Sequence, residues 1–391
     1  MSQQSFRELG VSRDVVETLA ARSITEPFTI QAAVLPDALA GLDILAKSPT
    51  GSGKTLAFGI PIAERTSPKD RRPGALVLVP TRELAQQVSD ELVAVGRPTG
   101  LSVAAVYGGV PLQAQAKRAR SAHVVVATPG RLQDLLDRRL LDLDAVRILV
   151  LDEADRMLDM GFKPQVDRIV KHLPRNRQTM FFSATLDDEV GELARRYTST
   201  PSRFEAGLPT ARENGEITHT FVPVTHDTKV ETLVKHLRAT ADGRTLVFVR
   251  TKRGADQLVR KLARHEVQAV AMHGDLSQSQ RQRALRRFES GEARVLVATD
   301  VAARGLDIEH IAHVVNYDPP AEHKEYVHRT GRTGRAGNDG IAITFVLPDQ
   351  QADAGRVAIH LGHRQQFEDS GLTPGRPRLV YSGRRRSRSK W

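Results

Sequence analysis

The chain places an apolar run directly before a glycine-rich turn, in the stretch Ile44-Leu45-Ala46-Lys47-Ser48-Pro49-Thr50-Gly51-Ser52-Gly53-Lys54-Thr55. The apolar run predicts a buried strand. The spacing that follows matches a phosphate-binding loop, except that Ser48 stands where the usual pattern has glycine. Gly51 and Gly53 let the backbone approach a phosphate and turn its N–H groups inward. Lys54 can then reach the β and γ phosphates, and the Thr55 hydroxyl can bind Mg²⁺.

Similar apolar runs recur along the first half of the chain, each followed by polar or small residues and a helix-like stretch. They are Ala75–Pro80, His123–Thr128, Arg147–Leu151 and Thr179–Ser183. Thr81–Val95 repeats its apolar residues at helical spacing. Continuous apolar runs that alternate with helices are typical of a parallel sheet covered by helices on both faces. The first half therefore predicts an α/β domain.

The alternation lapses near Pro201 and then resumes. Residues 207–215 carry Gly and Pro without a periodic apolar face, which predicts a linker. Strand-like runs return at Thr245–Val249, Val267–Met272, Arg294–Ala298, His313–Asn316 and Ile341–Val346. We therefore expect two α/β domains, 1–206 and 216–366. Residues 367–391 are expected to form a basic, disordered tail, because the last 21 residues hold seven basic residues and no acid.

Composition narrows the class of protein. A length of 391 residues, 40% hydrophobic residues and 26% charged residues fit a two-domain globular protein. The net charge of +11 favours a polyanionic partner, although a basic solvated surface would give the same value. The absence of cysteine excludes disulfides and thiolate metal sites and suits a reducing compartment. No apolar run approaches the roughly 18 residues of a membrane span, and Ser2–Leu9 lacks the apolar core of a signal peptide. We expect a cytoplasmic protein.

An acidic pair follows the apolar run that ends at Leu151. Ligands bind at the carboxyl ends of the strands in an open parallel sheet. Asp152 is placed to hold the Mg²⁺ that bridges phosphates, and Glu153 to orient or deprotonate the attacking water. An isolated Asp-Glu pair is more often a solvated helix start, so it is the combination with the phosphate loop that favours catalysis.

A run of arginines lies far along the chain, in His328-Arg329-Thr330-Gly331-Arg332-Thr333-Gly334-Arg335. Guanidinium groups from a second domain can neutralise the charge that develops on a transferred phosphoryl group, as arginine fingers do. On its own, this stretch could equally be a basic loop that contacts solvent or RNA phosphate. If Arg332 and Arg335 touch the same nucleotide as Lys54, binding must draw the two domains together.

Taken in order, these motifs resemble a DEAD-box RNA helicase of superfamily 2 over essentially residues 6–346. The resemblance implies two tandem RecA-like domains, ATP and Mg²⁺ as cofactors, RNA as partner and RNA-stimulated hydrolysis of ATP. Ser23 and Ile24 depart from it, because the family usually has glycine and then an aromatic residue that stacks on adenine. Ile24 offers only an apolar wall, so we expect weaker binding of adenine, with selectivity retained through Gln31. Thr330 replaces the isoleucine usual in the arginine motif.

The resemblance also implies a role for each site residue. The nucleotide site comprises Phe6, Ile24, Gln31, Ser48, Thr50, Gly51, Ser52, Gly53, Lys54, Thr55, Asp307, Arg332 and Arg335, and Thr55 and Asp152 hold the metal. The residues on the RNA side are Pro80, Thr81, Arg82, Gly108, Gly109, Thr128, Pro129, Gly130, Arg131, Arg250, Thr251, Gln278, Arg281 and Thr299. Ser183 and Thr185 couple hydrolysis to strand separation, and they complete a catalytic set with Glu153, Lys54, Asp152, Arg332 and Arg335.

The expected activity is local unwinding of short RNA duplexes, driven by closure of the two domains over one bent strand. Contacts mainly to phosphates and 2′-hydroxyls imply little sequence preference. Two alternatives stay open, namely an ATP-gated RNA clamp that does not unwind and a DNA helicase of the same superfamily. Ribosome assembly, RNA decay and cold adaptation are all compatible settings, so ribosomal or RNA-decay assemblies are candidate partners.

Overall fold

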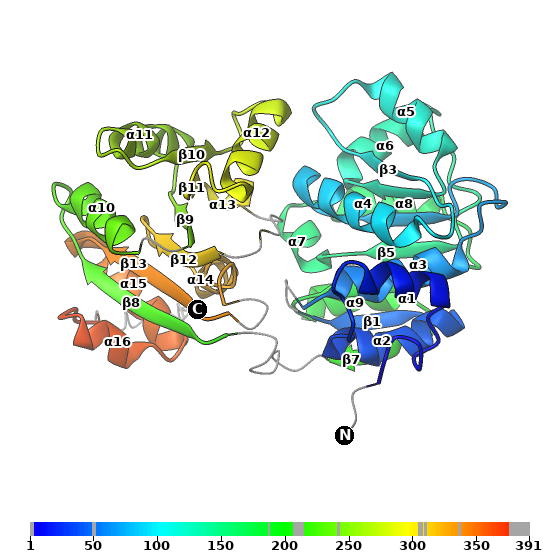
Figure 1. Ribbon diagram of the computed structural model, residues 1–391, viewed down its shortest axis with the longest axis horizontal. Coiled ribbons are helices and arrows are strands. Elements are labelled where there is room, and N and C mark those ends of the chain that lie inside the picture. Colours follow the sequence, from blue (N-terminus) through cyan, green and yellow to red (C-terminus); the bar gives the residue numbers. More distant parts are fainter. Residues whose placement is uncertain are drawn as a thin grey trace, which may run out of the picture.

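The computed structural model describes residues 4–48, 52–186, 188–205, 215–240, 243–303, 308, 311–334 and 338–374. They form two lobes, each built around its own sheet (Figure 1). The first lobe contains the elements up to β7 and the second those from β8 onward. The expected α/β architecture of two parallel sheets flanked by helices is therefore confirmed.

The first sheet has seven parallel strands in the order β3-β4-β2-β5-β6-β1-β7. Its strands are β1 (Ile44–Lys47), β2 (Ala75–Leu78), β3 (Val103–Val106), β4 (Val124–Ala127), β5 (Ile148–Leu151), β6 (Gln178–Ser183) and β7 (Ser202–Glu205). The helices of this lobe are α1 (Arg13–Ala20), α2 (Thr29–Ala40), α3 (Lys54–Arg65), α4 (Arg82–Gly96), α5 (Leu112–Ser121), α6 (Pro129–Asp137), α7 (Ala154–Asp159), α8 (Lys163–Lys171) and α9 (Asp188–Tyr197).

The second sheet has six parallel strands in the order β10-β11-β9-β12-β13-β8. They are β8 (Ile217–Pro223), β9 (Arg244–Phe248), β10 (Ala269–Met272), β11 (Val295–Ala298), β12 (Ile311–Asn316) and β13 (Gly340–Val346). The helices are α10 (Lys229–Ala239), α11 (Lys252–Ala263), α12 (Gln278–Glu289), α13 (Asp300–Ala303), α14 (His323–Thr330), the 3-10 turn η1 (Pro348–Gln350), α15 (Gln351–His360) and α16 (Arg364–Asp369).

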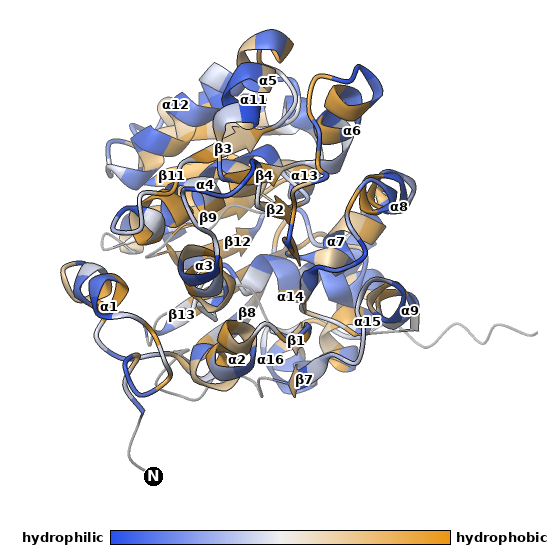
Figure 2. Ribbon diagram, turned by 90° about the vertical axis from the view of Figure 1, so that its right-hand side faces the viewer, coloured by the Kyte–Doolittle hydropathy of each residue, from blue (hydrophilic) through white to orange (hydrophobic). Residues whose placement is uncertain are grey.

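Each sheet separates two apolar cores, because successive strand residues point to opposite faces. In β1, Ile44 and Ala46 join one core while Leu45 joins the other. In β9, Leu246 and Val247 divide in the same way. The hydrophobic colour in Figure 2 accordingly gathers on the strands and on the helix faces turned toward them. Burial on both faces is what makes the central strands read as continuous apolar runs.

Every strand expected from the sequence is present, with ends that shift by a residue or two. Three strands were not expected, namely β3, β7 and β8. All three lie at sheet edges, and in each of them partly buried or exposed residues alternate with others along the strand. An edge strand is covered less completely than a central one. The sequences of β7 and β8 accordingly lack the continuous apolar run that identified the other strands, whereas β3 is a short apolar run that contains two alanines.

The expected tail begins too early. Residues 367–374 belong to the fold, because α16 buries Phe367 completely and Leu372 is 7% exposed in the same small core. The Gln351 side chain also donates a hydrogen bond to the Thr373 carbonyl at 2.9 Å. An apolar residue at each of two positions suffices to hold this segment against α14 and α15. Residues 375–391 and nearly all of the expected linker, 207–214, lie outside the described residues.

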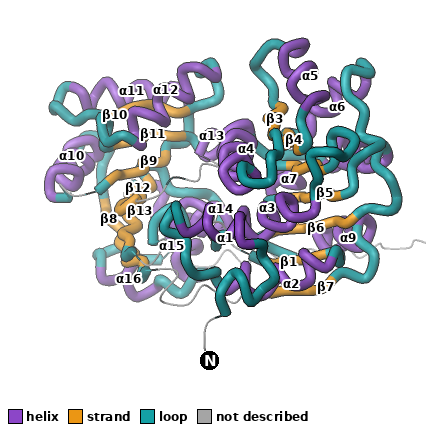
Figure 3. The backbone as a smooth tube through the Cα atoms, turned by 45° about the vertical axis from the view of Figure 1, so that its right-hand side comes forward, coloured by secondary structure: helices purple, strands orange, loops and turns teal. Residues whose placement is uncertain are grey.

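The order of the strands divides one edge of the first sheet into two halves. Adjacent strands β5, β6 and β1 lead into the acidic pair, the segment from Ser183 and the phosphate loop. The other neighbours, β2, β4 and β3, lead into the segments at Pro80, Thr128 and Gly108. Across this edge, α12, α13 and α14 of the second lobe face α4 and α7 of the first (Figures 1 and 3).

No helix in the described part of the chain is long and apolar enough to cross a membrane.

Candidate active site

The phosphate loop ends in Gly53, a position that no other residue type can occupy without strain. Gly53 has φ +80°, and a Cβ there would meet the ring of Phe28 and the side-chain amide of Gln31. Gln31 is 2% exposed. Its amide oxygen accepts a hydrogen bond from the Phe28 N–H at 2.9 Å, and its amide nitrogen donates to the Gly53 carbonyl at 2.8 Å. The expected adenine reader is thus tied directly to the end of the phosphate loop.

The start of the loop is tied to the neighbouring strand. The Ser48 N–H donates to the Ser183 carbonyl at 2.8 Å, which joins the start of the loop to the end of β6. The Ser48 and Ser52 hydroxyls hydrogen-bond each other in the interior. Thr50 and Gly51 lie outside the described residues.

Lys54 and the acidic pair form one buried charge cluster. Lys54 begins α3, and its Nζ lies 3.1 Å from an Asp152 carboxylate oxygen and 3.6 Å from a Glu153 oxygen. Their exposed fractions are 6%, 0% and 4%. Glu153 adopts φ +54° as the residue that precedes α7. This left-handed backbone costs of order 1 kcal/mol for a residue other than glycine. The Glu153 carboxylate contacts both Lys54 and Arg156, the latter on α7 itself.

Burial acts differently on the two acids. Burial raises the pKa of the Asp152 carboxyl to about 6, despite the nearby ammonium of Lys54. For Glu153, burial is outweighed by the guanidinium of Arg156 and the ammonium of Lys54, so its pKa lies well below the usual range. The opposing carboxylates likewise outweigh burial at Lys54 and raise its pKa. Lys54 and Glu153 are therefore firmly ionised at neutral pH.

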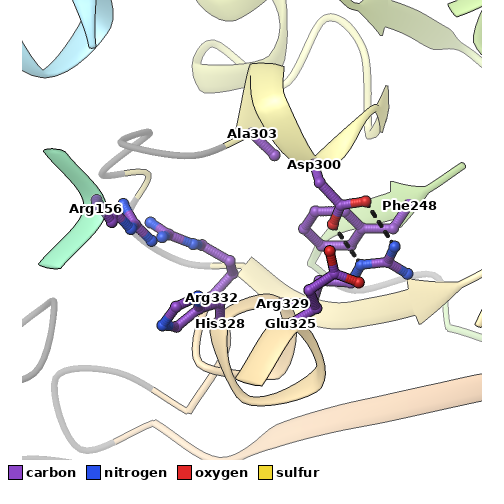
Figure 4. Close-up of a pocket in the computed structure, with 8 residues that line it drawn as sticks. All are labelled: Arg156, Phe248, Asp300, Ala303, Glu325, His328, Arg329 and Arg332. Atoms are coloured by element: carbon purple, nitrogen blue, oxygen red, sulfur yellow. Dashed lines mark hydrogen bonds and ion pairs between the residues drawn. The ribbon is translucent and has the colours of Figure 1, made fainter. Parts of the chain in front are cut away.

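Two arginines complete the cluster, one from each lobe. Arg156 Nη1 donates to Glu153 Oε2 at 2.6 Å, and both side chains are 5% exposed. Arg332 follows α14 in the second lobe and is 4% exposed. Its positive charge also lowers the pKa of Glu153. Figure 4 shows Arg156 and Arg332 side by side on one cavity between the lobes. Arg335 and Asp307 lie outside the described residues.

The sequence did not single out Arg329, which anchors this arrangement. Its guanidinium donates two hydrogen bonds to Asp300, at 2.6 and 2.7 Å, drawn as dashed lines in Figure 4. It also donates to the Asp318 carbonyl at 2.7 Å and lies 5.0 Å from the centre of the Phe248 ring. Arg329 thereby fixes α14, and with it Arg332, against α13 and β9. Its partners are distant in sequence, so no local pattern reveals the role.

A short chain of contacts joins the acidic motif to the segment after β6. The Asp155 N–H donates to the Ser183 hydroxyl at 3.2 Å, and Asp155 accepts the Thr185 N–H at 3.3 Å. Ser183 is completely buried. Hydrogen bonds thus connect Asp155, two residues after Glu153, directly with Ser183 and Thr185.

A cavity of about 350 Å³ opens beside the phosphate loop. Gln31, Gly53, Thr55 and Ile24 line it, together with Arg22 and Phe28. Phe6, by contrast, is 2% exposed within the apolar core of the first lobe, so the structure does not bring it to this cavity.

The expected RNA-side residues of the first lobe gather where β2, β3 and β4 end. Pro80 and Thr81 precede α4, where the Thr81 hydroxyl accepts the Leu84 N–H at 3.3 Å. The Arg82 guanidinium lies against Gly108 and Gly109, so a Cβ at Gly109 would require it to move. Thr128, Pro129 and Gly130 begin α6, and Arg131 donates to the Val110 carbonyl at 2.9 Å.

The second lobe presents its set at the matching ends of β9, β10 and β11. Arg250 and Thr251 are exposed, whereas Gln278 and Thr299 are each 8% exposed. Arg281 on α12 reaches across the lobes, and its guanidinium lies 3.0 Å from the Glu83 carboxylate on α4. Nearby, Gln282 hydrogen-bonds Tyr107. An ion pair whose side chains are 6% and 13% exposed thus joins the two lobes through Glu83 and Arg281.

Comparison with known proteins decides the family. A model of the DEAD/DEAH box helicase matches residues 28–193, and a model of the helicase conserved C-terminal domain matches residues 228–337. The chain belongs to the DEAD/DEAH box helicase family. It is 42% identical to the ATP-dependent RNA helicase DbpA of Bacillus subtilis, over 92% of this chain and 75% of the relative. It is also 42% identical to the DEAD-box ATP-dependent RNA helicase CshA of Geobacillus kaustophilus, over 88% and 74%.

Solved helicases of the family differ in how well their whole chains superpose on this one. Dbp5 of S. cerevisiae, bound to RNA and ADP BeF3, is 32% identical and covers 92% of this chain and 94% of its own, with a TM-score of 0.81. A DEAD box protein from Methanococcus jannaschii is 36% identical over 95% and 98%, with a TM-score of 0.54. The lobes here are thus arranged as in the RNA- and nucleotide-bound helicase, in keeping with the Glu83–Arg281 pair between them.

Proposed function

We propose that this chain is an ATP-dependent RNA helicase that binds single-stranded RNA across its two domains and locally unwinds short duplexes. The observation that carries the proposal is the split site, in which Lys54, Asp152 and Glu153 of one lobe share a buried charge cluster with Arg332 of the other. Relatives named ATP-dependent RNA helicases and a family structure bound to RNA and ADP BeF3 support it. We take 1–206 and 216–374 as the two domains and 207–215 as their linker.

At the nucleotide, Lys54 and the loop N–H groups bind the phosphates. Glu153 is anionic, so it can accept the proton of the attacking water. Arg332, with Arg335, neutralises charge on the transferred phosphoryl group only when the domains close. Arg329 is a positioning residue, because it acts by holding α14 against Asp300.

The residues present fit a magnesium ion. Asp152 is completely buried, and among the described residues its carboxylate is ion-paired with Lys54 at 3.1 Å. Such oxygens, with the neighbouring Thr55 hydroxyl, are the hard ligands that Mg²⁺ prefers. Asp152 and Thr55 would hold it, and the ion would supply charge neutralisation between phosphates.

On the RNA side, we propose that the residues at the ends of β2, β3 and β4 and those at β9, β10 and β11 form one backbone groove. Closure aligns the two sets into a path that fits one bent strand. Separating a base pair costs on the order of 1.4 kcal/mol per stacking step, by analogy with DNA, so each closure opens only a few pairs. Hydrolysis at Glu153 would reach the groove through Asp155, Ser183 and Thr185 and allow reopening.

Turnover and strand separation test this function together. In Glu153→Gln we expect ATP and RNA to bind while RNA-stimulated hydrolysis is nearly lost. Lys54→Ala should weaken the binding of ATP itself. Glu192→Gln, a change in an exposed ion pair with Arg196, is the matched control and should behave as wild type.

Displacement of a strand from a short RNA duplex separates a helicase from a clamp, and comparing stimulation by RNA and by DNA separates an RNA from a DNA enzyme. Near-normal turnover in Glu153→Gln would overturn the catalytic assignment. We also propose a cytoplasmic location, in keeping with a chain that contains no cysteine, and ribosomal or RNA-decay assemblies as partners.

A further inference from the structure

The cavity beside the phosphate loop contains an aromatic ring that the resemblance did not lead us to expect. We propose that Phe28 supplies the aromatic face for the purine base, and that the Arg22–Glu91 ion pair supplies a second flat surface of the same pocket. The inference rests on the proposed function, because it concerns the base of the nucleotide bound there.

Phe28 is an aromatic side chain left open to solvent. The chain has 12 phenylalanines, all within the described residues, and Phe28 is the most exposed of them at 39%. The exposed part of the phenyl ring gains no stabilisation from burial in the folded protein. Phe28 lies on the wall of a cavity of about 350 Å³. This volume lies within the roughly 300–1,000 Å³ range of small-molecule sites, so a bound ligand could cover the exposed part of the ring.

The ring is held in place by the residues that read and bind the nucleotide. Its edge packs on Gly53, where a Cβ would come within 3.3 Å of the ring atom Cε2 and closer still to Cδ2. The Phe28 N–H donates to Gln31, whose amide nitrogen donates to the Gly53 carbonyl. The Phe28 ring, the Gln31 side chain and the end of the phosphate loop are therefore connected by direct contacts. A planar base that takes a hydrogen bond from Gln31 lies within reach of the ring.

Arg22 and Glu91 provide a second, rigid surface. Arg22 follows α1 and Glu91 lies on α4, and two parallel hydrogen bonds of 2.8 and 2.7 Å join guanidinium to carboxylate. Both residues line the cavity. A guanidinium fixed in this way presents its flat face at little further entropic cost and stacks on aromatic systems. Leu84 and Val88 of α4 line the same cavity with apolar surface.

These groups specify the chemical class of the ligand. A phenyl face, a pinned guanidinium and apolar side chains favour a flat π-system. The single amide of Gln31 adds a directional contact to its edge. Ile24 lines the cavity and also packs against the core, so it bounds the pocket without offering a π-face. The base of a purine nucleotide fits all four features.

Titration calorimetry with ATP, GTP and inorganic tripolyphosphate, each in magnesium buffer, tests the proposal. Phe28→Leu keeps the apolar bulk but removes the π-face, and because Phe28 caps α2 only through its backbone, the helix start is preserved. We expect Phe28→Leu to weaken ATP binding about 3- to 10-fold, the size of an aromatic contact. Tripolyphosphate affinity should stay unchanged, because it has no base. Phe28→Tyr should bind ATP as wild type.

Two further variants sharpen the test. Leu42→Ala alters an exposed apolar side chain beyond the other end of α2 and should bind ATP normally. Ile24→Tyr should add little to the wild type but restore ATP binding in Phe28→Leu, since either ring can then face the base. Arg22→Ala should weaken ATP and leave tripolyphosphate unaffected.

The outcomes distinguish this inference from the function beneath it. If the wild type binds ATP and Phe28→Leu binds it equally well, the proposed base contact is wrong while the function stands. An equal loss of ATP and tripolyphosphate in Phe28→Leu would likewise overturn the base contact, since the ring would then act through the loop. If the wild type binds neither ATP nor tripolyphosphate, the nucleotide site itself is refuted.

Discussion

Glu83→Gln should loosen the closed arrangement of the two lobes. The Glu83 carboxylate lies 3.0 Å from the Arg281 guanidinium, and the side chains are only 6% and 13% exposed. At this distance, with an effective dielectric constant of about 20, the gross attraction is roughly 5 kcal/mol. Desolvation of both groups offsets much of this attraction, so we take a net contribution of about 1–3 kcal/mol, the usual size of a coupling free energy between two sites. The ratio of closed to open protein should therefore fall about 5- to 150-fold.

Energy transfer between two dyes measures that ratio directly. The chain contains no cysteine, so cysteines introduced at Val93 on α4 and Ile359 on α15 give one label in each lobe. Both positions are exposed, at 49% and 42%. The closed fraction is followed with RNA and a non-hydrolysable ATP analogue in wild type and in Glu83→Gln. RNA-stimulated hydrolysis should fall in parallel.

Two controls show whether the ion pair is responsible. Glu292→Gln removes the same charge from an exposed pair with Arg287 inside the second lobe and should leave closure unchanged. The exchange Glu83→Arg with Arg281→Glu should recover part of the closed fraction. An identical closed fraction in Glu83→Gln and wild type would refute the reasoning, because the pair would then contribute nothing between the lobes.

Three other changes test the second lobe. Arg332→Ala should lower RNA-stimulated turnover about 10³-fold, if arginine-finger magnitudes transfer, and a rate within twofold of wild type would remove Arg332 from the site. Ending the chain at Pro374 removes seven basic residues. The slope of log RNA affinity against log salt concentration should then shrink by about 1–3, while turnover at saturating RNA stays unchanged. His219 stacks on His363 at 3.9 Å and accepts from or donates to the Tyr326 hydroxyl, and burial, with the nearby charge of His363, lowers its pKa to about 4. The unfolded chain therefore binds more protons between about pH 4 and 6.5, so the second lobe should lose about 1–2 kcal/mol of stability from pH 7.5 to 5, and His219→Phe should abolish that part of the loss in urea unfolding.

The sequence predicted those parts of the site that lie where a continuous apolar strand ends. Lys54 and Asp152 follow β1 and β5, which are buried on both faces. The apolar run of each strand therefore predicted both the strand and the position of the functional residue after it. The structure places both in contact, and 3.1 Å separates the Lys54 ammonium from the Asp152 carboxylate.

The rest depends on contacts between segments far apart in the chain. Arg329 meets Asp300 29 residues away, and Arg281 meets Glu83 across nearly 200. No local pattern encodes such partners. Phe6 was predicted to contact the nucleotide and is instead buried in the apolar core of the first lobe. An aromatic side chain suits either environment, so its residue type alone did not distinguish them. The edge strands β7 and β8 escaped prediction because polar residues interrupt their apolar pattern.

The charged groups around Lys54 alternate in sign, as the ions of a salt do. Asp152 and Glu153 stand where the phosphates of a nucleotide would otherwise meet Lys54, and Arg156 and Arg332 complete the alternation. Binding of a nucleotide would then exchange the carboxylates that neutralise Lys54 for phosphates. Triphosphate without its metal would bring negative charge against two buried carboxylates, whereas the magnesium complex replaces an anion with an anion and a cation with a cation. The protein should accordingly discriminate against bare ATP before any step of catalysis begins.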